Sequence, residues 1–239
     1  GVLQWRAYVS QSRAIEDIMP ISAVLFDLDN TLYPISSGLM KGVDVRITAY
    51  VKNLLGLDDA QAQALRQQYY SEYGTTLNGL QLFHSVDAED YLSYVHDVAI
   101  ESFLASDAEL NRLLAELQAT KAIFTNAPGE YARRVLQVLG VEQHFAHIFD
   151  IRFSGFRPKP DPAVYRSVLD LLGVAGHETI LIEDTLQNLA PARELGMTTI
   201  LVGQPHSPNG TIDYVVADVL AAVRVAIELA GGHGKGPTR

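Results

Sequence analysis

Two carboxylates stand two residues apart in Asp27-Leu28-Asp29-Asn30-Thr31, directly after the apolar run Ala23–Phe26. The run predicts a strand that is buried on both faces, as in parallel sheets. An acidic pair at such a strand end can share a hard divalent cation such as Mg²⁺ with Asp184. One carboxylate can then attack phosphorus as a nucleophile, and the other can hand a proton to the leaving oxygen. The pair therefore points to phosphoryl-group chemistry.

The acidic pair also has a simple structural explanation, because Asp side chains cap strand ends through Asx turns. A calcium loop of the EF-hand type is a second alternative, but it requires Gly at its sixth position and Glu at its twelfth. Leu32 and Gly38 stand at those positions. The calcium loop is therefore excluded, whereas the Asx turn stays open at this point.

Further apolar runs predict strands, and helical patterns lie between them. The expected strands cover residues 121–125, 147–151, 179–182, 198–202 and 214–216. Asp107 and Asp161 are expected to cap the starts of helices, and Gly140 and Gly173 are expected to follow helix ends. This alternation from 120 to 230 is typical of a parallel sheet with helices on both faces. The predicted fold class is α/β, with a Rossmann-like parallel sheet at its core.

Residues 36–106 interrupt the alternation. Apolar residues keep helical spacing over 43–54 and 88–95, and no strand pattern lies between them. We expect an all-helical cap domain inserted after the first strand and placed over the carboxyl edge of the sheet, where open α/β sheets bind ligands. The predicted core domain covers 1–35 and 107–239, and the predicted cap covers 36–106, with residues 73–80 as a loop at its tip.

Four short motifs, taken together and in this order, resemble the haloacid dehalogenase superfamily of aspartate-nucleophile phosphatases. They are residues 27–31, Thr125-Asn126 at a strand end, Lys159 within 157–162, and Glu183-Asp184-Thr185 with Asn188. The resemblance extends over nearly the whole chain. It implies a hydrolase of phosphoric monoesters that forms a phosphoaspartyl intermediate on Asp27. It also implies Asp29 as the general acid, and Mg²⁺ as a cofactor bound by Asp27, Asp29 and Asp184.

The resemblance gives roles to the residues around these groups. Thr125 and Asn126 supply a hydroxyl and an amide, which are neutral groups suited to phosphate oxygens. Lys159 lies between two prolines, which stiffen its backbone. Its ammonium would bind phosphate and counter the charge on Asp27. Supporting contacts are expected from Thr31, Glu183 and Asn188.

Three positions bear on the type of reaction. Asp29 favours phosphoryl chemistry, because family members that act on carbon–halogen bonds differ at this position and need no metal. Asn188 stands where the family often has another acid, and Glu183 stands where many members have Gly. The roles of Asn188 and Glu183 are therefore left open.

The cap resembles the pyrimidine 5′-nucleotidase branch of the family, which acts on nucleotides such as UMP and CMP. The similar segments are residues 30–34, 73–80 and 83–84. The resemblance implies substrate contacts from Tyr73, Thr75, Thr76, Asn78 and Phe83. A phosphatase or phosphomutase for another small phosphoester, such as a sugar phosphate, is the alternative. A binding protein that has lost turnover is a third interpretation, which the intact core motifs disfavour.

The composition limits the class of partner. Hydrophobic residues make up 48% and charged residues 19% of the 239 residues, which argues against disorder. A formal net charge of −10 disfavours nucleic-acid polymers and anionic membranes. The chain has no cysteine, which excludes disulfides and thiol catalysis. We expect a cytoplasmic enzyme whose partner is a small phosphorylated metabolite, and the resemblance makes that metabolite a nucleotide.

Overall fold

The computed structural model describes residues 20–203 and 212–231. Its centre is one sheet of parallel strands in the order β3-β2-β1-β4-β5-β6. The strands are β1 (Ala23–Phe26), β2 (Thr120–Phe124), β3 (His147–Phe149), β4 (Thr179–Glu183), β5 (Thr198–Val202) and β6 (Tyr214–Val216). The predicted α/β class with a parallel sheet is confirmed. The predicted core also includes residues 1–19, 204–211 and 232–239, which lie outside the described part.

The first strand lies in the middle of the sheet, and its side chains alternate between the two faces. Val24 and Phe26 belong to the apolar cluster on one face, and Leu25 belongs to the cluster on the other. Phe26 is in register with Ile123 of β2 and with Ile182 of β4. The three strands therefore end within one residue of one another, and the residues that follow them share one edge.

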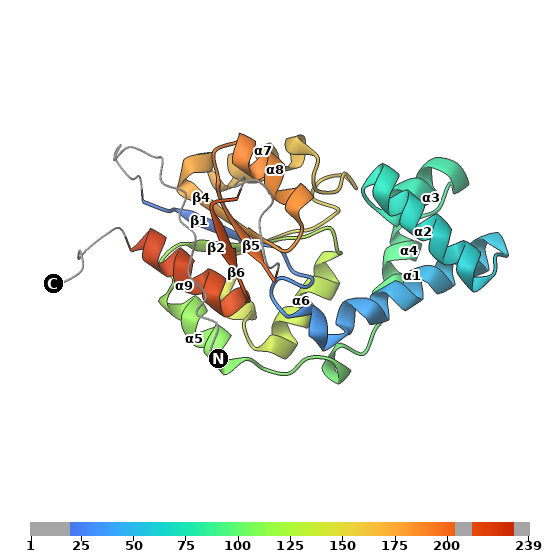
Figure 1. The fold of residues 1–239 in the computed structure, drawn as a ribbon, viewed down its shortest axis with the longest axis horizontal. Helices are drawn as coiled ribbons and strands as arrows, with labels where there is room; N and C mark the ends of the chain where they lie inside the picture. Colours follow the sequence, from blue (N-terminus) through green and yellow to red (C-terminus); the bar gives the residue numbers. More distant parts are fainter. Residues whose placement is uncertain (1–19, 204–211, 232–239) are drawn as a thin grey trace, which may run out of the picture.

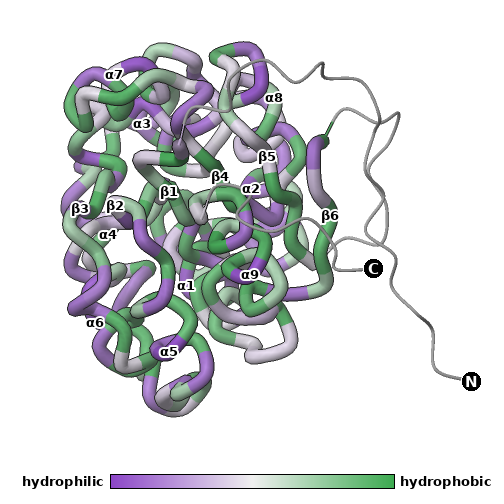
Figure 2. Tube along the Cα trace, turned by 90° about the vertical axis from the view of Figure 1, so that its left-hand side faces the viewer, coloured by the Kyte–Doolittle hydropathy of each residue, from purple (hydrophilic) through white to green (hydrophobic). Residues whose placement is uncertain are grey.

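Helices cover both faces of the sheet. Figure 2 shows α5 (Ala108–Glu116), α6 (Gly129–Leu139) and α9 (Val219–Ala230) on one side of the strands. On the other side lie α7 (Pro162–Leu172) and α8 (Leu186–Glu194). The predicted N-caps are confirmed, since Asp107 and Asp161 accept backbone N–H bonds at the starts of α5 and α7. Gly140 and Gly173 follow α6 and α7 in the left-handed conformation, as expected.

Part of the chain between β1 and β2 forms a separate group of helices beside the sheet (Figure 1). They are α1 (Leu39–Leu55), α2 (Asp59–Tyr73), α3 (Thr76–His84) and α4 (Ala88–Val95). These helices have an apolar cluster of their own, which includes Val51, Tyr69, Leu80 and Tyr91. The expected helical insertion is present, whereas its exact limits at 36 and 106 stay a prediction. We call α1–α4 the cap and the rest of the described chain the core.

The expectation of a loop over residues 73–80 is wrong, because α3 begins at Thr76. The Thr75 side chain caps this helix by accepting the Asn78 N–H at 3.1 Å. Gly79 lies inside the helix, where a side-chain carbon would overlap the ring of Tyr69. The two glycines that suggested a loop thus have different roles. Gly74 ends α2 with a φ of 80°, whereas Gly79 allows α3 to pack closely against α2.

Arg152 connects the cap with the core. Its Nη2 lies 2.6 Å from Glu89 Oε2 in α4, and its Nη1 lies 2.8 Å from Glu130 Oε2 in α6. The neighbouring Ile151 is 3% exposed and packs into the apolar cluster of the cap. One loop of the core therefore holds the cap by an ion pair and by an apolar contact.

Short 3₁₀ helices complete the described chain, at Ile35–Ser37, Ile100–Ser102, Glu142–His144 and Gly176–Glu178. None of the helices in the described ranges is both long enough and apolar enough to cross a membrane.

Candidate active site

The acidic and polar residues of the four motifs lie at the carboxyl edge of the sheet. Asp27 follows β1, while Thr125 and Asn126 follow β2. Glu183 is the last residue of β4, and Asp184 comes after it. Since β2 and β4 are the two neighbours of β1, residues far apart in the sequence become neighbours at this edge.

Lys159 lies at the centre of this edge. Its Nζ donates to Asp27 Oδ1 at 2.7 Å, to Glu183 Oε2 at 2.7 Å and to the Phe124 carbonyl at 2.8 Å. The side chains of Lys159 and Glu183 are each 1% exposed, and that of Asp27 is 9% exposed. Each of the three ammonium protons thus has an acceptor. The positive charge is held in one place beside the predicted nucleophile.

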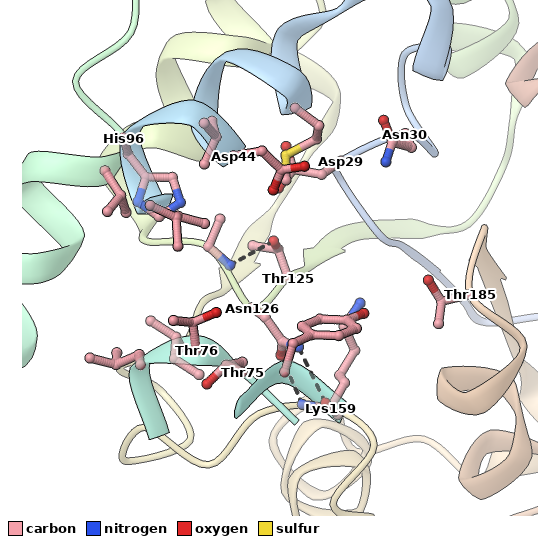
Figure 3. Close-up of a pocket in the computed structure, with 18 of the residues that line it drawn as sticks. Asp29, Asn30, Asp44, Thr75, Thr76, His96, Thr125, Asn126, Lys159 and Thr185 are labelled. Atoms are coloured by element: carbon pink, nitrogen blue, oxygen red, sulfur yellow. Dashed lines mark hydrogen bonds between the residues drawn. The ribbon is translucent and has the colours of Figure 1, made fainter. Parts of the chain in front are cut away.

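Asn126 fixes the backbone of Lys159. Its Oδ1 accepts the Lys159 N–H at 2.8 Å, and its Nδ2 donates to the Lys159 carbonyl at 3.2 Å (Figure 3). The Thr125 hydroxyl oxygen accepts the Ala127 N–H at 3.0 Å and so shapes the turn after β2. These contacts give both residues a positioning role, and their expected contact with phosphate stays a prediction.

Burial raises the pKa of each carboxyl group in this cluster. Burial and the charge of Glu183 raise the pKa of Asp27 to about 6, although Lys159 acts in the opposite direction. Burial raises the pKa of Glu183 to about 7, and burial and the charge of Asp27 raise that of Asp184. Burial alone would lower the pKa of Lys159, but Asp27 and Glu183 outweigh it and raise that pKa. Three carboxylates around one ammonium leave an excess of negative charge.

Three of these carboxylates are close enough together to bind a metal ion. One oxygen each from Asp27, Glu183 and Asp184 lie within 4.8 Å of one another. Hard carboxylate oxygens and an excess of negative charge are the chemistry that Mg²⁺ requires, so the residues present fit this ion. The metal ligands predicted from the sequence are Asp27, Asp29 and Asp184, so they include Asp29 in place of Glu183. These ligands stay a prediction.

Asp29 faces two buried tyrosines. The Tyr131 hydroxyl donates to Asp29 Oδ1 at 3.0 Å, and the Tyr33 hydroxyl donates to the same oxygen. Burial raises the pKa of Asp29 to about 6, while the bond from Tyr33 lowers it and the charge of Asp27 raises it. A carboxyl group with a pKa near neutrality can both give and take a proton, which suits the expected acid role. No role was expected for either tyrosine from the sequence.

Two threonines lie next to the acidic side chains. Thr185 donates its N–H to Glu183 Oε1 at 3.1 Å and its hydroxyl to Asp184 Oδ1 at 3.2 Å. It therefore orients both acidic side chains. Thr31 is 1% exposed, and its hydroxyl lies close enough to Asp27 to lower the pKa of that carboxyl group.

A cavity of about 450 Å³ lies between this edge and the cap. Figure 3 shows Asp44, Thr75, Thr76 and His96 of the cap region around the same space as Thr125, Asn126 and Lys159. Asp27, Asp29, Asp184 and Asn188 also line the cavity. Its volume falls within the range of pockets that bind small organic molecules.

The residues expected to contact substrate from the cap divide into two groups. Thr75 and Thr76 line the cavity, whereas Tyr73, Asn78 and Phe83 are not part of its lining. The Asn78 side chain donates to the Tyr73 carbonyl at 3.0 Å. The rings of Tyr73 and Phe83 pack edge to face, with centroids 5.4 Å apart. These three residues therefore contribute to packing within the cap.

Other cap residues that line the cavity had no signal in the sequence. Burial raises the pKa of Tyr70, and the nearby charges of Glu183 and Asp184 raise it further. Tyr70 lines the same cavity as Glu183 and Asp184. The His96 ring lies 4.7 Å from the ring of Tyr131, and burial lowers the pKa of His96 to about 4. These contacts join helices from different parts of the chain, so no local pattern marks them.

The sequence is similar to known proteins over most of its length. Phosphate metabolism protein 8 of Saccharomyces cerevisiae is 28% identical over 191 residues, which is 74% of this chain and 60% of that protein. A 5′-nucleotidase of Pseudomonas aeruginosa is 25% identical over 217 residues, or 86% of this chain and 95% of that protein. A phosphoglycolate phosphatase of Rhodospirillum rubrum is 26% identical over 204 residues, or 77% and 80%. This chain thus spans only part of the yeast relative.

The fold has solved counterparts. The HAD-hydrolase YfnB of Bacillus subtilis, solved with bound magnesium, has a TM-score of 0.59 and 16% identity over 87% of this chain and 99% of that chain. Identity at this level relates the two folds alone. A family model described as haloacid dehalogenase-like hydrolase matches residues 21–196, a range that contains every residue named above at the sheet edge. The chain therefore belongs to the haloacid dehalogenase-like hydrolases.

Proposed function

We propose that this chain is a Mg²⁺-dependent phosphomonoesterase in which Asp27 is the nucleophile. One observation carries the proposal: Asp27 lies 2.7 Å from the Lys159 ammonium and belongs to a group of three carboxylates within 4.8 Å of one another. A nucleophilic carboxylate, a fixed cation and a metal-binding cluster are the parts that phosphoryl transfer to an aspartate requires. Membership of a hydrolase family supports the same reaction.

The first step transfers the phosphoryl group to the enzyme. An Asp27 oxygen attacks phosphorus, and the bond between phosphorus and the leaving oxygen breaks. Asp29 gives its proton to that oxygen, so the leaving group departs as a neutral alcohol. Lys159 stays beside Asp27 and stabilises the negative charge on the transferring group. Mg²⁺ bound by the carboxylate cluster would supply further charge stabilisation for the phosphoryl oxygens.

The second step regenerates the enzyme. Asp29, now ionised, takes a proton from a water molecule whose oxygen attacks phosphorus. The bond between phosphorus and Asp27 breaks, and inorganic phosphate is released. Tyr33 and Tyr131 hold Asp29 Oδ1 throughout, which keeps the carboxyl group in one orientation.

Nucleoside 5′-monophosphates, and pyrimidine nucleotides first among them, are the substrates that we propose. The Pseudomonas aeruginosa 5′-nucleotidase, which this chain matches over 95% of that protein's length, supports the assignment. The cavity volume of about 450 Å³ offers room for a leaving group of nucleoside size. The cytoplasmic location expected from the sequence stays a prediction.

A phosphatase or phosphomutase acting on another small phosphoester is the second candidate. The phosphoglycolate phosphatase of Rhodospirillum rubrum, 26% identical to this chain, favours it. The core chemistry would be the same, and the difference would lie in the cap.

The test is phosphate release from UMP, a sugar phosphate, 2-phosphoglycolate and p-nitrophenyl phosphate, each with Mg²⁺ and with EDTA. We expect release that requires Mg²⁺, and an acid-quenched sample should carry a phosphoryl group on the peptide that contains Asp27. Asp27→Asn should release no phosphate, whereas Asp97→Asn, at an exposed site after α4, should be as active as the wild type. Undiminished release in EDTA, or by Asp27→Asn, would contradict the mechanism.

A further inference from the structure

The cap contributes an ion pair to the wall of the active-site cavity, between Arg66 of α2 and Asp44 of α1. Arg66 Nη2 lies 3.1 Å from Asp44 Oδ1, and Arg66 Nη1 donates to the Asp44 backbone carbonyl at 2.8 Å. The Arg66 side chain is 18% exposed and that of Asp44 is 44% exposed. A guanidinium group carries five N–H donors, so these two contacts leave donors for a molecule in the cavity.

The cap also lines the cavity with apolar side chains. They come from α1, α3 and α4, namely Met40, Val43, Ile47, Leu77, Leu92 and Val95. A ligand that fills the cavity displaces water from the pair, and polar contacts gain strength where little water competes for them. A flat apolar face of a ligand can pack against the same wall.

Positive charge is scarce on the cap side of the cavity. His96 lines it too, but burial lowers the His96 pKa to about 4, so the ring is neutral at pH 7. Arg66 is then the one cationic side chain that the cap gives to the lining within the described residues, and Asp44 balances it. A second negative charge on a substrate, remote from the phosphoryl group, would meet no unbalanced cation there.

We propose that the Arg66–Asp44 pair recognises the leaving group and selects an uncharged one that presents a hydrogen-bond acceptor beside a donor, as the amide edge of a nucleobase does. The guanidinium donates to the acceptor, and the Asp44 carboxylate accepts from the donor. A leaving group with a carboxylate, such as that of 2-phosphoglycolate, is disfavoured. This inference rests on the proposed function and adds to it the chemical class of the leaving group.

The experiment compares kcat and KM on three probes with Mg²⁺: UMP, 2-phosphoglycolate and phenyl phosphate, whose leaving group has neither a polar edge nor a second anion. The wild type should prefer UMP to 2-phosphoglycolate by about tenfold or more in kcat/KM. Arg66→Met should raise KM for UMP by about tenfold and change kcat little. The same variant should change kcat/KM for phenyl phosphate by no more than about twofold.

Asp44→Asn tests the charge argument in the opposite direction. It leaves the Arg66 charge unbalanced beside the leaving group, so the ratio of kcat/KM for 2-phosphoglycolate to that for UMP should rise by about tenfold. Arg66→Lys keeps the charge and loses the planar fork of donors. It replaces Arg66→Met if that variant does not fold, and it should raise KM for UMP several-fold.

The matched control is a second ion pair between the same two helices. Lys52 Nζ lies 2.7 Å from Asp59 Oδ1, and neither residue lines the cavity. Lys52→Met should therefore leave the preference among the three probes unchanged. The proposal would be overturned if the ratio of kcat/KM for UMP to that for 2-phosphoglycolate stays within about twofold of the wild-type ratio in both Asp44→Asn and the Arg66 variant. An equal loss on all three probes would do so too, because the pair would then serve only to join α1 and α2.

The wild-type data separate this inference from the proposed function. Activity on phenyl phosphate with no preference for UMP over 2-phosphoglycolate overturns the inference and leaves the proposed phosphatase activity intact. Absence of activity on every phosphoester with Mg²⁺ overturns the proposed function, and the inference with it.

Discussion

Lys159 Nζ lies 2.7 Å from Asp27 Oδ1, and the two side chains are 1% and 9% exposed. Lys159 stands three residues before the start of α7, and Asp27 follows β1. A buried ion pair keeps both charges away from water, so the loss of one partner leaves the other uncompensated. The stability and the activity of this protein therefore depend on the same pair.

Lys159→Met should lower both the stability and the activity of the protein. Three carboxylates would remain without their cation, so the free energy of unfolding in EDTA at pH 7 should fall by about 3–5 kcal/mol. The kcat for phosphate release should fall by about a hundredfold or more. Urea unfolding and turnover measurements check the two effects. Lys41→Met on the exposed surface of α1 is the control, and a Lys159 variant as stable as that control would contradict the prediction.

Mg²⁺ should stabilise the wild type through the carboxylate cluster. A ligand at about one hundred times its Kd adds about 2.7 kcal/mol to the free energy of unfolding. Asp184→Asn removes one of the three carboxylates, so the gain on adding Mg²⁺ should largely disappear. Thermal unfolding in EDTA and in Mg²⁺ measures this gain in stability, and Glu101→Gln at an exposed position is the control. A gain that survives in Asp184→Asn would place the ion elsewhere.

His96 should make the protein less stable in mild acid. Burial lowers its pKa from the ordinary 6.5 to about 4, so the unfolded chain takes up a proton there more readily than the native state. The stability that His96 contributes is complete above pH 6.5 and is lost as the pH falls towards 4. Relative to His96→Gln, the wild type should lose on the order of 2 kcal/mol between pH 7 and pH 4.

Urea unfolding across this pH range measures the difference between wild type and His96→Gln. His177→Gln, which alters an exposed histidine, is the control. If the curves of His96→Gln and wild type stay parallel, His96 is accessible to protons in the native state.

Gly79→Ala should destabilise the cap. A side-chain carbon there would overlap the Tyr69 ring, so α2 and α3 would have to separate at a cost of about 1–3 kcal/mol. At Gly42 of α1, the nearest atom to an added carbon would be Phe103 Cζ at 3.4 Å, so Gly42→Ala should be neutral or slightly stabilising. Thermal unfolding of the two variants checks the contrast, and equal effects would contradict it.

The sheet and the acidic strand ends were predictable because their signals are local. A run of four buried residues marks β1, and the carboxylates that follow it stand in a short motif. N-caps such as Asp107 and Asp161 are local as well, since each bonds a backbone N–H within a few residues. Parallel pairing then fixes which strand ends meet, so much of the core followed from the sequence.

The cap and the surroundings of Asp29 were not predictable in the same way. Tyr131 reaches Asp29 across 102 positions of the chain, and the contact exists only once α6 has packed on the sheet. The segment 73–80 suggested a loop because two glycines punctuate it. Only the closeness of Tyr69, which belongs to the preceding helix, explains why one of them lies within α3.

Because Arg152 joins the cap to the core through ion pairs, the contact between them depends on the salt concentration. Its side chain is 32% exposed, and those of Glu89 and Glu130 are 56% and 59% exposed. Solvent ions can therefore screen these bonds, since the Debye length falls from about 10 Å at 0.1 M salt to about 3 Å at 1 M. The apolar contact of Ile151 with the cap carries no charge and escapes this screening. At high salt concentration, the hydrophobic contact of Ile151 therefore holds the cap on the core more than the ion pairs of Arg152 do. This effect does not depend on the charge of the molecule bound in the cavity.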